Sequence, residues 1–307
     1  MDQGSEPAGD AAEPLATGGR MNRATRAFVA HRNLLFTVAY EMLGSAADAE
    51  DVLQETWLRW VGVDLDTVRD QRAYLVRITT REALTRLRTL RRRRESYVGQ
   101  WLPEPLLTAP DVAEDVELAD SVSMAMLLVL ETLAPTARAV FVLREVFDLG
   151  YEEIAEAVGK SPPAVRQIAH RARAHVAERR PREVVSPAQS RDVIDAFRRA
   201  IETGDVQGLL DVLAPDVVLV GDGGGVVPAA PAPVVGADSV AGLLGRATGV
   251  AVYPAQINGH PALIVRRDGE IDTVMAVRVD GDLITGLYAV RNPEKLSRVE
   301  RETSLRR

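Results

Sequence analysis

The chain has 307 residues, a formal net charge of −7 and no cysteine. Its length allows two or three domains, and the missing cysteine excludes disulfides and thiolate-bound metals. No apolar run approaches the length of a membrane span, and the first twenty residues lack the basic and apolar blocks of a signal peptide, so we expect a cytoplasmic protein without membrane contact.

The charges of this acidic chain are strongly segregated. Residues 81–94 hold seven Arg and one Glu, residues 101–121 hold six acids and no base, and residues 160–182 hold seven Lys or Arg and one Glu. Two basic blocks on either side of an acidic one predict two DNA contacts, separated by a segment that avoids DNA.

The N-terminal part reads as a tail and a helical domain. Residues 1–22 are predicted to be a disordered acidic tail, and residues 23–95 a helical domain. Within the latter, Gly44 ends a first helix, and the stretch ADAEDVLQETWLRW forms a second. Taken alone, the outward face of this second helix is a solvated surface, since a helix N-terminus favours acids anyway. That face includes Asp51, Gln54 and Glu55.

A third helix, Tyr74 to Arg94, turns basic toward its end. Such a face is suited to phosphate binding, although a charge run is often merely solvated. Its candidate DNA-binding residues are Arg77, Arg81, Arg86 and Arg88. The segment 96–116 is predicted to be a linker, because it carries glycine and several prolines. It is too apolar to lie free and is expected to contact another surface through Trp101, Leu102, Pro103, Glu104 and Pro105.

Residues 117–182 are predicted to form a second helical domain. One helix is expected over Val122 to Leu133, and Phe141 to Val176 reads as a helix-turn-helix. There Gly159 stops the first helix and Ser161 caps the second. The basic outer face of the second helix could reach base edges in a major groove, whereas the simpler alternative is a solvated hairpin. The DNA-binding candidates are Ser161, Arg166, Gln167, His170, Arg171 and Arg173, of which Arg173, like Arg179 and Arg180, is suited to phosphates.

Residues 187–296 are predicted to form an α+β cone, and residues 297–307 a tail. Helical patterns come first, and after a further helix at Ala237 to Gly245 come four strand-like runs. We expect these strands to be antiparallel, with hairpin turns at Asp268-Gly269 and Asp280-Gly281.

The glycine-rich stretch GDGGG at 221–225 is predicted to be an irregular loop that follows a strand at 217–220. It could be taken for a phosphate cradle, but it lacks the spacing and the Lys-Ser/Thr of a P-loop.

Three of these stretches together resemble an extracytoplasmic-function sigma factor: DAEDVLQETWLRW, the Tyr74–Arg94 helix and the Phe141–Val176 unit. The resemblance covers roughly residues 24–180 and implies two all-α domains, corresponding to sigma regions 2 and 4. It implies that the protein is a promoter-specificity subunit, with core RNA polymerase and promoter DNA as partners.

The resemblance also implies roles for single residues. Asp51, Gln54 and Glu55 match positions that, in that family, dock on the clamp helices of the polymerase largest subunit. The Tyr74–Arg94 helix matches the element that melts and reads the −10 promoter element, and the helix after Ser161 matches the −35 reader. This chain has Arg81 and Thr85 where many relatives carry Asn and Asp, so we expect a different −10 preference.

The remaining third resembles the SnoaL-like extension, of the nuclear-transport-factor-like fold, that one group of these sigma factors carries. YVGQWLPEPL resembles the linker motif of that group, and DGGG and NPEKL resemble the signatures of the extension, although Val226 stands where the family usually has Lys. The resemblance implies regulation in cis. Because the apolar linker needs a partner surface, we expect these two signatures to pack near it, through Asp222, Gly223, Gly224, Gly225, Asn292, Pro293, Lys295 and Leu296.

Other functions are open from the residues alone. SnoaL-like folds often host proton-transfer enzymes or bind small molecules, and candidate catalytic residues are Asp222, Tyr253, His260 and Tyr288. Such an enzyme or sensor fused to a helix-turn-helix module is one alternative, and a free-standing repressor is another. Neither explains the outward acidic face of the second helix. With four His and no Cys, we predict no metal site and no cofactor.

Overall fold

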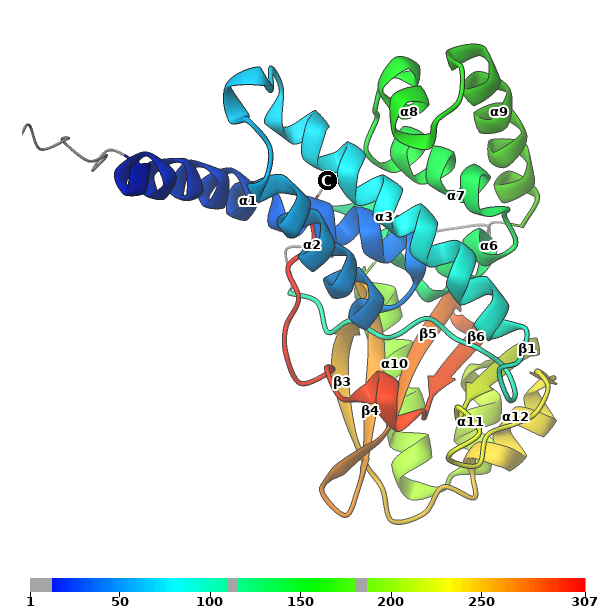
Figure 1. The fold of residues 1–307 in the computed structure, drawn as a ribbon. Helices are drawn as coiled ribbons and strands as arrows, with labels where there is room; N and C mark the ends of the chain where they lie inside the picture. Colours follow the sequence, from blue (N-terminus) through cyan, green and yellow to red (C-terminus); the bar gives the residue numbers. More distant parts are fainter. Residues whose placement is uncertain (1–12, 110–114, 180–186, 307) are drawn as a thin grey trace, which may run out of the picture.

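The computed structural model describes residues 13–109, 115–179 and 187–306. Two helical domains lie above a β-sheet, and the linker between them passes between the helices and the sheet (Figure 1). Within the described ranges, no helix is long and apolar enough to cross a bilayer.

The first helical domain is built from three long helices. Gly44 (φ 65°) and Ser45, whose hydroxyl accepts from the Asp48 N–H, form the corner between the first two, as predicted. The predicted disordered tail is wrong for residues 13–22, which are helical and belong to α1. Residues 1–12 lie outside the described part of the chain. The elements are α1 (Glu13–Leu43), α2 (Ala46–Val61), a 3₁₀ turn (Leu65–Thr67) and α3 (Gln71–Arg94).

The second helical domain contains the predicted helix-turn-helix. Gly159 (φ 67°) ends its first helix, as predicted. The single helix predicted from Val122 to Leu133 is wrong, because Ser123 adopts an extended conformation and its hydroxyl accepts from the Met126 N–H, which caps a new helix. The elements are α5 (Val116–Val122), α6 (Met124–Glu131), α7 (Pro135–Phe141), a π-helical turn (Val142–Val146), α8 (Tyr151–Val158) and α9 (Pro162–Arg179).

The two helical domains share one hydrophobic core. A single cluster of buried side chains extends from α1 to α9 and includes Leu35, Trp60, Leu127 and Ile154. Burial of each such side chain contributes about 1.5–3 kcal/mol, so this shared core holds the two helical domains against each other. We call this packing of the two domains the closed arrangement.

The C-terminal domain is a six-stranded sheet in the order β2-β1-β6-β5-β4-β3. The antiparallel prediction is correct for β3 to β6, but β1 runs parallel to β6, because β2, α12 and β3 to β5 intervene between these two strands in the chain and no hairpin joins them. The elements are α10 (Pro187–Thr203), α11 (Val206–Val212), β1 (Leu213–Asp222), β2 (Val234–Val235), α12 (Ala237–Leu244), β3 (Ala251–Ile257), β4 (His260–Arg267), β5 (Glu270–Asp280), β6 (Leu283–Val290) and α13 (Pro293–Leu296).

The turns of this domain depend on residues that accept positive φ. Asp268 (φ 53°) and Gly269 (φ 87°) form the predicted hairpin turn, and Asn258 (φ 55°) with Gly259 forms another. The turn predicted at Asp280-Gly281 is shifted by one residue, because Asp280 still pairs with Leu283.

The glycine-rich stretch is only partly irregular. The predicted loop at 221–225 is wrong for Gly221 and Asp222, which pair with Ala289 and Val290 of β6, so the irregular part begins at Gly223. The neighbouring strand supplies the hydrogen-bond partners that outweigh the low strand propensity of glycine.

The sheet has two buried faces. One packs against α10, α11 and α12 around Phe197, Leu219 and Met275. The other packs against the linker, α6 and α13, with Leu102, Met124 and Leu296 at its centre. The second face therefore joins the C-terminal domain to the helical domains.

The linker and the C-terminal tail lie side by side next to the sheet. The Thr108 N–H donates to the Gln256 carbonyl of β3, and the Thr303 N–H donates to the Leu107 carbonyl. Beyond this point Leu305 is buried in the helical core, and the Arg306 N–H donates to the Thr37 hydroxyl of α1. The tail thus connects the C-terminal domain to the first helical domain.

Candidate DNA-binding, polymerase-binding and interdomain sites

The outer face of α9 carries the predicted DNA-binding side chains. Its inner face is buried through Val165, Ala169, Ala172 and Val176, which leaves the opposite face in solvent. Arg166 lies 3.7 Å from Glu152, and Arg173 donates to Glu145 at 2.6 Å. Arg180 lies outside the described residues. The exposed candidates on this face are Ser161, Arg166, Gln167, His170, Arg171 and Arg173.

The basic face of α3 contacts the helix-turn-helix. The Arg77 guanidinium pairs with the Glu156 carboxylate of α8 at 2.9 Å, and the Arg81 guanidinium donates to the Glu156 carbonyl at 2.8 Å. Arg88 is exposed. Two of the four predicted −10 residues, Arg77 and Arg81, are therefore bonded to the second helical domain.

The outward face of α2 is exposed as predicted. Asp51, Gln54 and Glu55 lie on it, and the spacing adds Leu58, which keeps 63% of its surface exposed. Sequence reasoning missed Leu58, although an apolar residue one turn beyond the acids was the available signal. The Asp51 carboxylate also accepts from Arg86 at 2.6 Å, so a predicted polymerase contact and a predicted DNA contact pair with each other.

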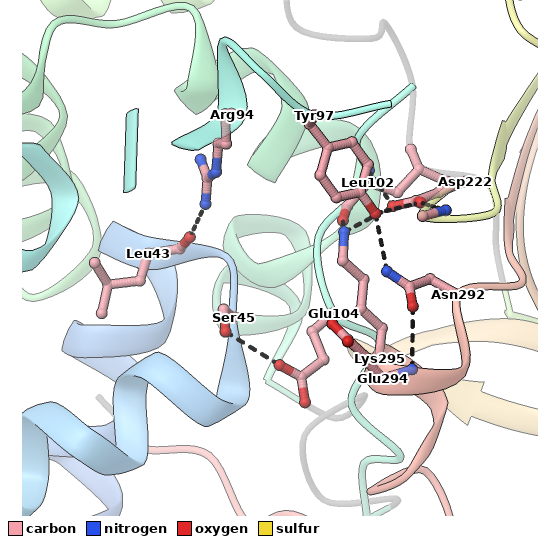
Figure 2. Close-up of polar contacts among 11 residues, drawn as sticks. Leu43, Ser45, Arg94, Tyr97, Leu102, Glu104, Asp222, Asn292, Glu294 and Lys295 are labelled. Atoms are coloured by element: carbon pink, nitrogen blue, oxygen red, sulfur yellow. Dashed lines mark hydrogen bonds and ion pairs between the residues drawn. The ribbon is translucent and has the colours of Figure 1, made fainter. Parts of the chain in front are cut away.

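The predicted interdomain residues converge on one buried carboxylate. Asp222 is fully buried at the end of β1 and accepts from four donors: the Tyr97 hydroxyl (2.7 Å), the Leu102 N–H (2.8 Å), the Gly224 N–H (3.0 Å) and the Lys295 ammonium (2.7 Å). Figure 2 shows this arrangement, which we call the Asp222 cluster and define as Tyr97, Leu102, Asp222, Asn292 and Lys295.

The Asp222 cluster joins three segments that are distant in the chain. The Asn292 amide donates to the Tyr97 hydroxyl at 2.9 Å, and Lys295 also donates to the Leu102 carbonyl at 2.6 Å. Burial lowers the pKa of Lys295, although Asp222 opposes this shift. The cation that pairs with Asp222 is Lys295, whereas Val226, which stands where the family usually has Lys, is exposed.

A second set of charges connects this cluster to the helical domains. Lys295 and Arg94 of α3 lie 4.5 Å and 3.6 Å from the centre of the Trp101 ring, within the range of cation–π attraction. Arg94 in turn pairs with Glu131 of α6, which also pairs with Arg138 of α7. Because Arg138 is almost fully buried, the triad depends on Glu131 for its charge balance.

The linker also closes the N-terminus of α2. The Glu104 carboxylate accepts from the Ser45 hydroxyl (3.2 Å) and the Ala47 N–H (3.1 Å), where the helix dipole favours an anion. The neighbouring Pro103 and Pro105 are buried as well. Residues Trp101 to Pro105 are thus in contact with both the helical domains and the sheet, as the composition of the linker predicts.

Two further interdomain contacts were not predicted. Asn258, in the turn between β3 and β4, is fully buried and bonds to α1, α5 and the linker at once. The tail contributes Thr303 and Leu305, as described above. In the sequence, the apolar Leu305 was the one feature of this tail that indicated a buried contact.

The four candidate catalytic residues do not meet in a cavity. Asp222 is held in the cluster, Tyr253 is half-exposed, and His260 lies 3.1 Å from the Ala119 carbonyl of α5. None of them, nor Tyr288, lines the large cavity of the C-terminal domain. The described residues also contain no group of three His, Asp or Glu that could hold a metal ion.

Comparison with known proteins identifies the family. Residues 27–93 match the model of Sigma-70 region 2, and residues 123–176 match that of Sigma-70, region 4. The ECF RNA polymerase sigma factor SigJ of Mycobacterium tuberculosis is 34% identical over 290 residues, which cover 88% of this chain and 92% of the relative. The chain belongs to the extracytoplasmic-function sigma factors.

Two further comparisons agree with this assignment. The probable ECF sigma factor SigI of the same organism is 34% identical, over 90% of this chain and 96% of its own. The crystal structure of SigJ matches with a TM-score of 0.69 and 33% identity, and covers 89% of this chain and 98% of that one. The sigma factor therefore directs transcription initiation, and its C-terminal domain is part of an architecture that SigJ shares.

Proposed function

We propose that α9 reads the −35 element, that α3 engages the −10 element, and that the α2 face binds core polymerase. The proposal rests on exposed Arg, Gln and His side chains near the N-terminal end of α9, which suit base edges, and on the cations of α3, which suit phosphates. Promoter DNA and core polymerase are the partners, and the protein acts with polymerase in the cytoplasm as an initiation factor rather than an enzyme.

The C-terminal domain regulates this activity in cis by holding the helical domains closed. In the closed arrangement Arg77 and Arg81 of α3 are bonded to Glu156 of α8, so the −10 surface is not free for DNA. The observation that carries the proposal is the buried Asp222 carboxylate, which binds the linker and Lys295 together. Removing one member of a buried ion pair costs about 3–5 kcal/mol, enough to shift such an equilibrium strongly.

Opening of the two helical domains is the step that the C-terminal domain controls. Core polymerase would favour the open form if it binds that form more tightly than the closed one, in which Arg77 and Arg81 are bonded to Glu156. The shared core of the helical domains and the buried contacts of the C-terminal domain both oppose this opening, so loss of the C-terminal contacts shifts the balance toward the open form.

Run-off transcription with core polymerase tests the proposal. Asp222→Asn keeps the shape of the side chain but removes the charge that Lys295 needs, so we expect several-fold more transcript at limiting sigma factor. Asp216→Asn, on the same strand but exposed, is the matched control and should behave as wild type. Equal transcription by the two variants would refute a regulatory role of the Asp222 cluster.

A crosslink tests closure directly, since the chain has no native cysteine. Cysteines at Arg77 and Glu156 can be joined by a short bismaleimide that contains a cleavable disulfide. The joined protein should be inactive, and reduction should restore the activity that the double variant has before crosslinking. Full activity of the joined protein would show that the closed arrangement is compatible with initiation.

A further inference from the structure

The C-terminal domain contains a large cavity that the contacts above do not use. It lies between α12 and the face of the sheet opposite the linker, and its volume is about 770 Å³. Pockets for small organic ligands commonly have about 300–1,000 Å³. Most of its wall is apolar, with Leu219, Val234, Leu243, Val265 and Met275 among the lining residues.

The charged residues of the cavity favour an anion. Three Arg and two Asp line it: Arg246, Arg267, Arg291, Asp238 and Asp272. Asp272 is already engaged, since its carboxylate accepts from Arg291 at 2.9 Å and lies 3.7 Å from Arg267. The three Arg exceed the two Asp by one positive charge, which favours a bound carboxylate or sulfonate.

Two of the lining Arg residues belong to segments that meet near Thr248. Arg267 donates to the Thr248 carbonyl at 3.1 Å, and Arg246 lies only two residues before Thr248. The side chain of Arg246 has no ion pair or hydrogen bond within the described part of the chain, and it is exposed at the cavity mouth. A single acidic group could therefore bind both.

We propose that this cavity binds a small organic anion with an apolar body, an aryl or medium-chain carboxylate or sulfonate, and that the ligand stabilises the closed arrangement. Arg246 and Arg267 bind the acidic group, and the apolar wall binds the body. The second half of this proposal rests on the proposed function; the first half does not.

The cavity and the Asp222 cluster share structural elements. Arg291 donates to the Pro228 carbonyl, which fixes the cavity wall at Pro228 to Ala230, and the Arg291 and Asn292 N–H groups both donate to the Asp222 carbonyl. The cavity wall and the Asp222 cluster are thus built on the same ends of β1 and β6. A ligand that touches this wall binds the closed arrangement more tightly and shifts the population toward it.

Binding is tested with the fluorescent anion 8-anilinonaphthalene-1-sulfonate and the full chain. Gly242 lines the cavity, and a Cβ there would meet no atom within 4 Å, so Gly242→Phe is designed to place a ring in the cavity and obstruct the ligand. We expect one saturable site in the wild type and none in Gly242→Phe. Equal binding by both would overturn the proposed site.

The charge contribution is tested separately. The double variant Arg246→Gln/Arg267→Gln should bind the anion at least 10-fold more weakly, while binding of the uncharged analogue N-phenyl-1-naphthylamine changes less than 2-fold. Arg199→Gln, an exposed Arg of α10 outside the cavity, is the control and should bind both probes as wild type does. An equal loss for both probes would overturn the assignment of the two Arg as anion ligands.

Coupling is tested by run-off transcription with saturating probe. We expect the anion to reduce transcription several-fold for the wild type and not for Gly242→Phe, which also controls for effects on polymerase. Binding without this difference would overturn the regulatory half and leave the site intact. Conversely, the probe could fail to bind while Asp222→Asn still raises transcription. That outcome would overturn the cavity site and leave the proposed function standing.

Discussion

The amide of Asn258 donates to the hydroxyl of Tyr40 at 2.6 Å, and this buried bond joins the C-terminal domain to α1. The same amide group donates to the Val122 carbonyl of α5, and its oxygen accepts from the Leu106 N–H of the linker. One side chain therefore contacts both helical domains and the linker. Asn258 also has a positive φ, which Asn tolerates better than most residues, so the turn and the hydrogen bonds both favour Asn at this position.

We predict that Asn258→Asp destabilises the closed arrangement, because Asp tolerates the turn but cannot donate to Tyr40 and Val122. Each buried group left without a partner costs about 1–3 kcal/mol. Tyr40→Phe removes only one partner and should cost less. Chemical denaturation of both single variants and the double variant measures the coupling, and strictly additive losses would contradict a direct interaction.

We predict that the free energy of unfolding decreases as the pH rises, because the buried Glu41 keeps its proton while the unfolded chain loses it. Complete burial raises the pKa of Glu41 to about 8, despite the hydrogen bond from Ser121 and the charge of Arg138. The unfolded chain releases this proton above the ordinary pKa of 4.5, whereas the folded protein holds it up to about pH 8. The free energy of unfolding therefore decreases as the pH rises between these two values. The slope is at most about 1.4 kcal/mol per pH unit.

The matching measurement compares Glu41→Gln with the wild type at pH 6 and pH 8. Gln has no proton to lose, so the variant should lose less stability between the two pH values. Identical pH dependence of the two proteins would show that Glu41 does not titrate in this range.

Removal of the central charge of the Arg94–Glu131–Arg138 triad should be strongly destabilising. Glu131→Gln leaves two guanidinium groups close together with no anion, and breaking a buried pair in this way costs about 3–5 kcal/mol. Glu152→Gln, whose exposed partner Arg166 lies 3.7 Å away, is the control and should change stability by about 0–1 kcal/mol. Similar denaturation midpoints for the two variants would contradict this account.

Polymerase binding should depend on the α2 face without affecting the fold. Glu55 is exposed and carries no interaction within the described residues, so Glu55→Arg should weaken core binding while the melting temperature stays nearly unchanged. Leu58→Ala should also weaken binding, since its exposed side chain lies on the same face. Pull-down of core polymerase by each variant measures the effect, and a large loss of stability would mean that these residues are structural.

Promoter choice should depend on the exposed face of α9. Replacing a base-reading Arg166 or Arg171 by Ala should cost about 1–3 kcal/mol and relax specificity at one position of the −35 element. Arg173→Ala should instead weaken binding to all promoters similarly, because a phosphate contact carries no sequence information. Transcription from a library of −35 variants separates these outcomes, and unchanged promoter choice would place the base-reading residues elsewhere.

The sequence alone determined the local features of this protein. Gly44, Gly159 and Asp268-Gly269 end helices or form turns where predicted, because their backbone preferences act within a few residues. The apolar spacing of α2 and α9 likewise predicted which side chains point outward, because a helix repeats every 3.6 residues whatever it packs against.

Only the tertiary structure decided which of these side chains meet. Asp222 and Leu102 are 120 residues apart, and Arg77 and Glu156 are 79 residues apart. Neither pairing has a periodic signature, because such contacts arise when separate domains pack through a shared core. The resemblance implied that the linker and the glycine-rich segment are close. Packing decided that Lys295 pairs with Asp222, that Asn258 joins three segments, and that the basic face of α3 contacts the helix-turn-helix.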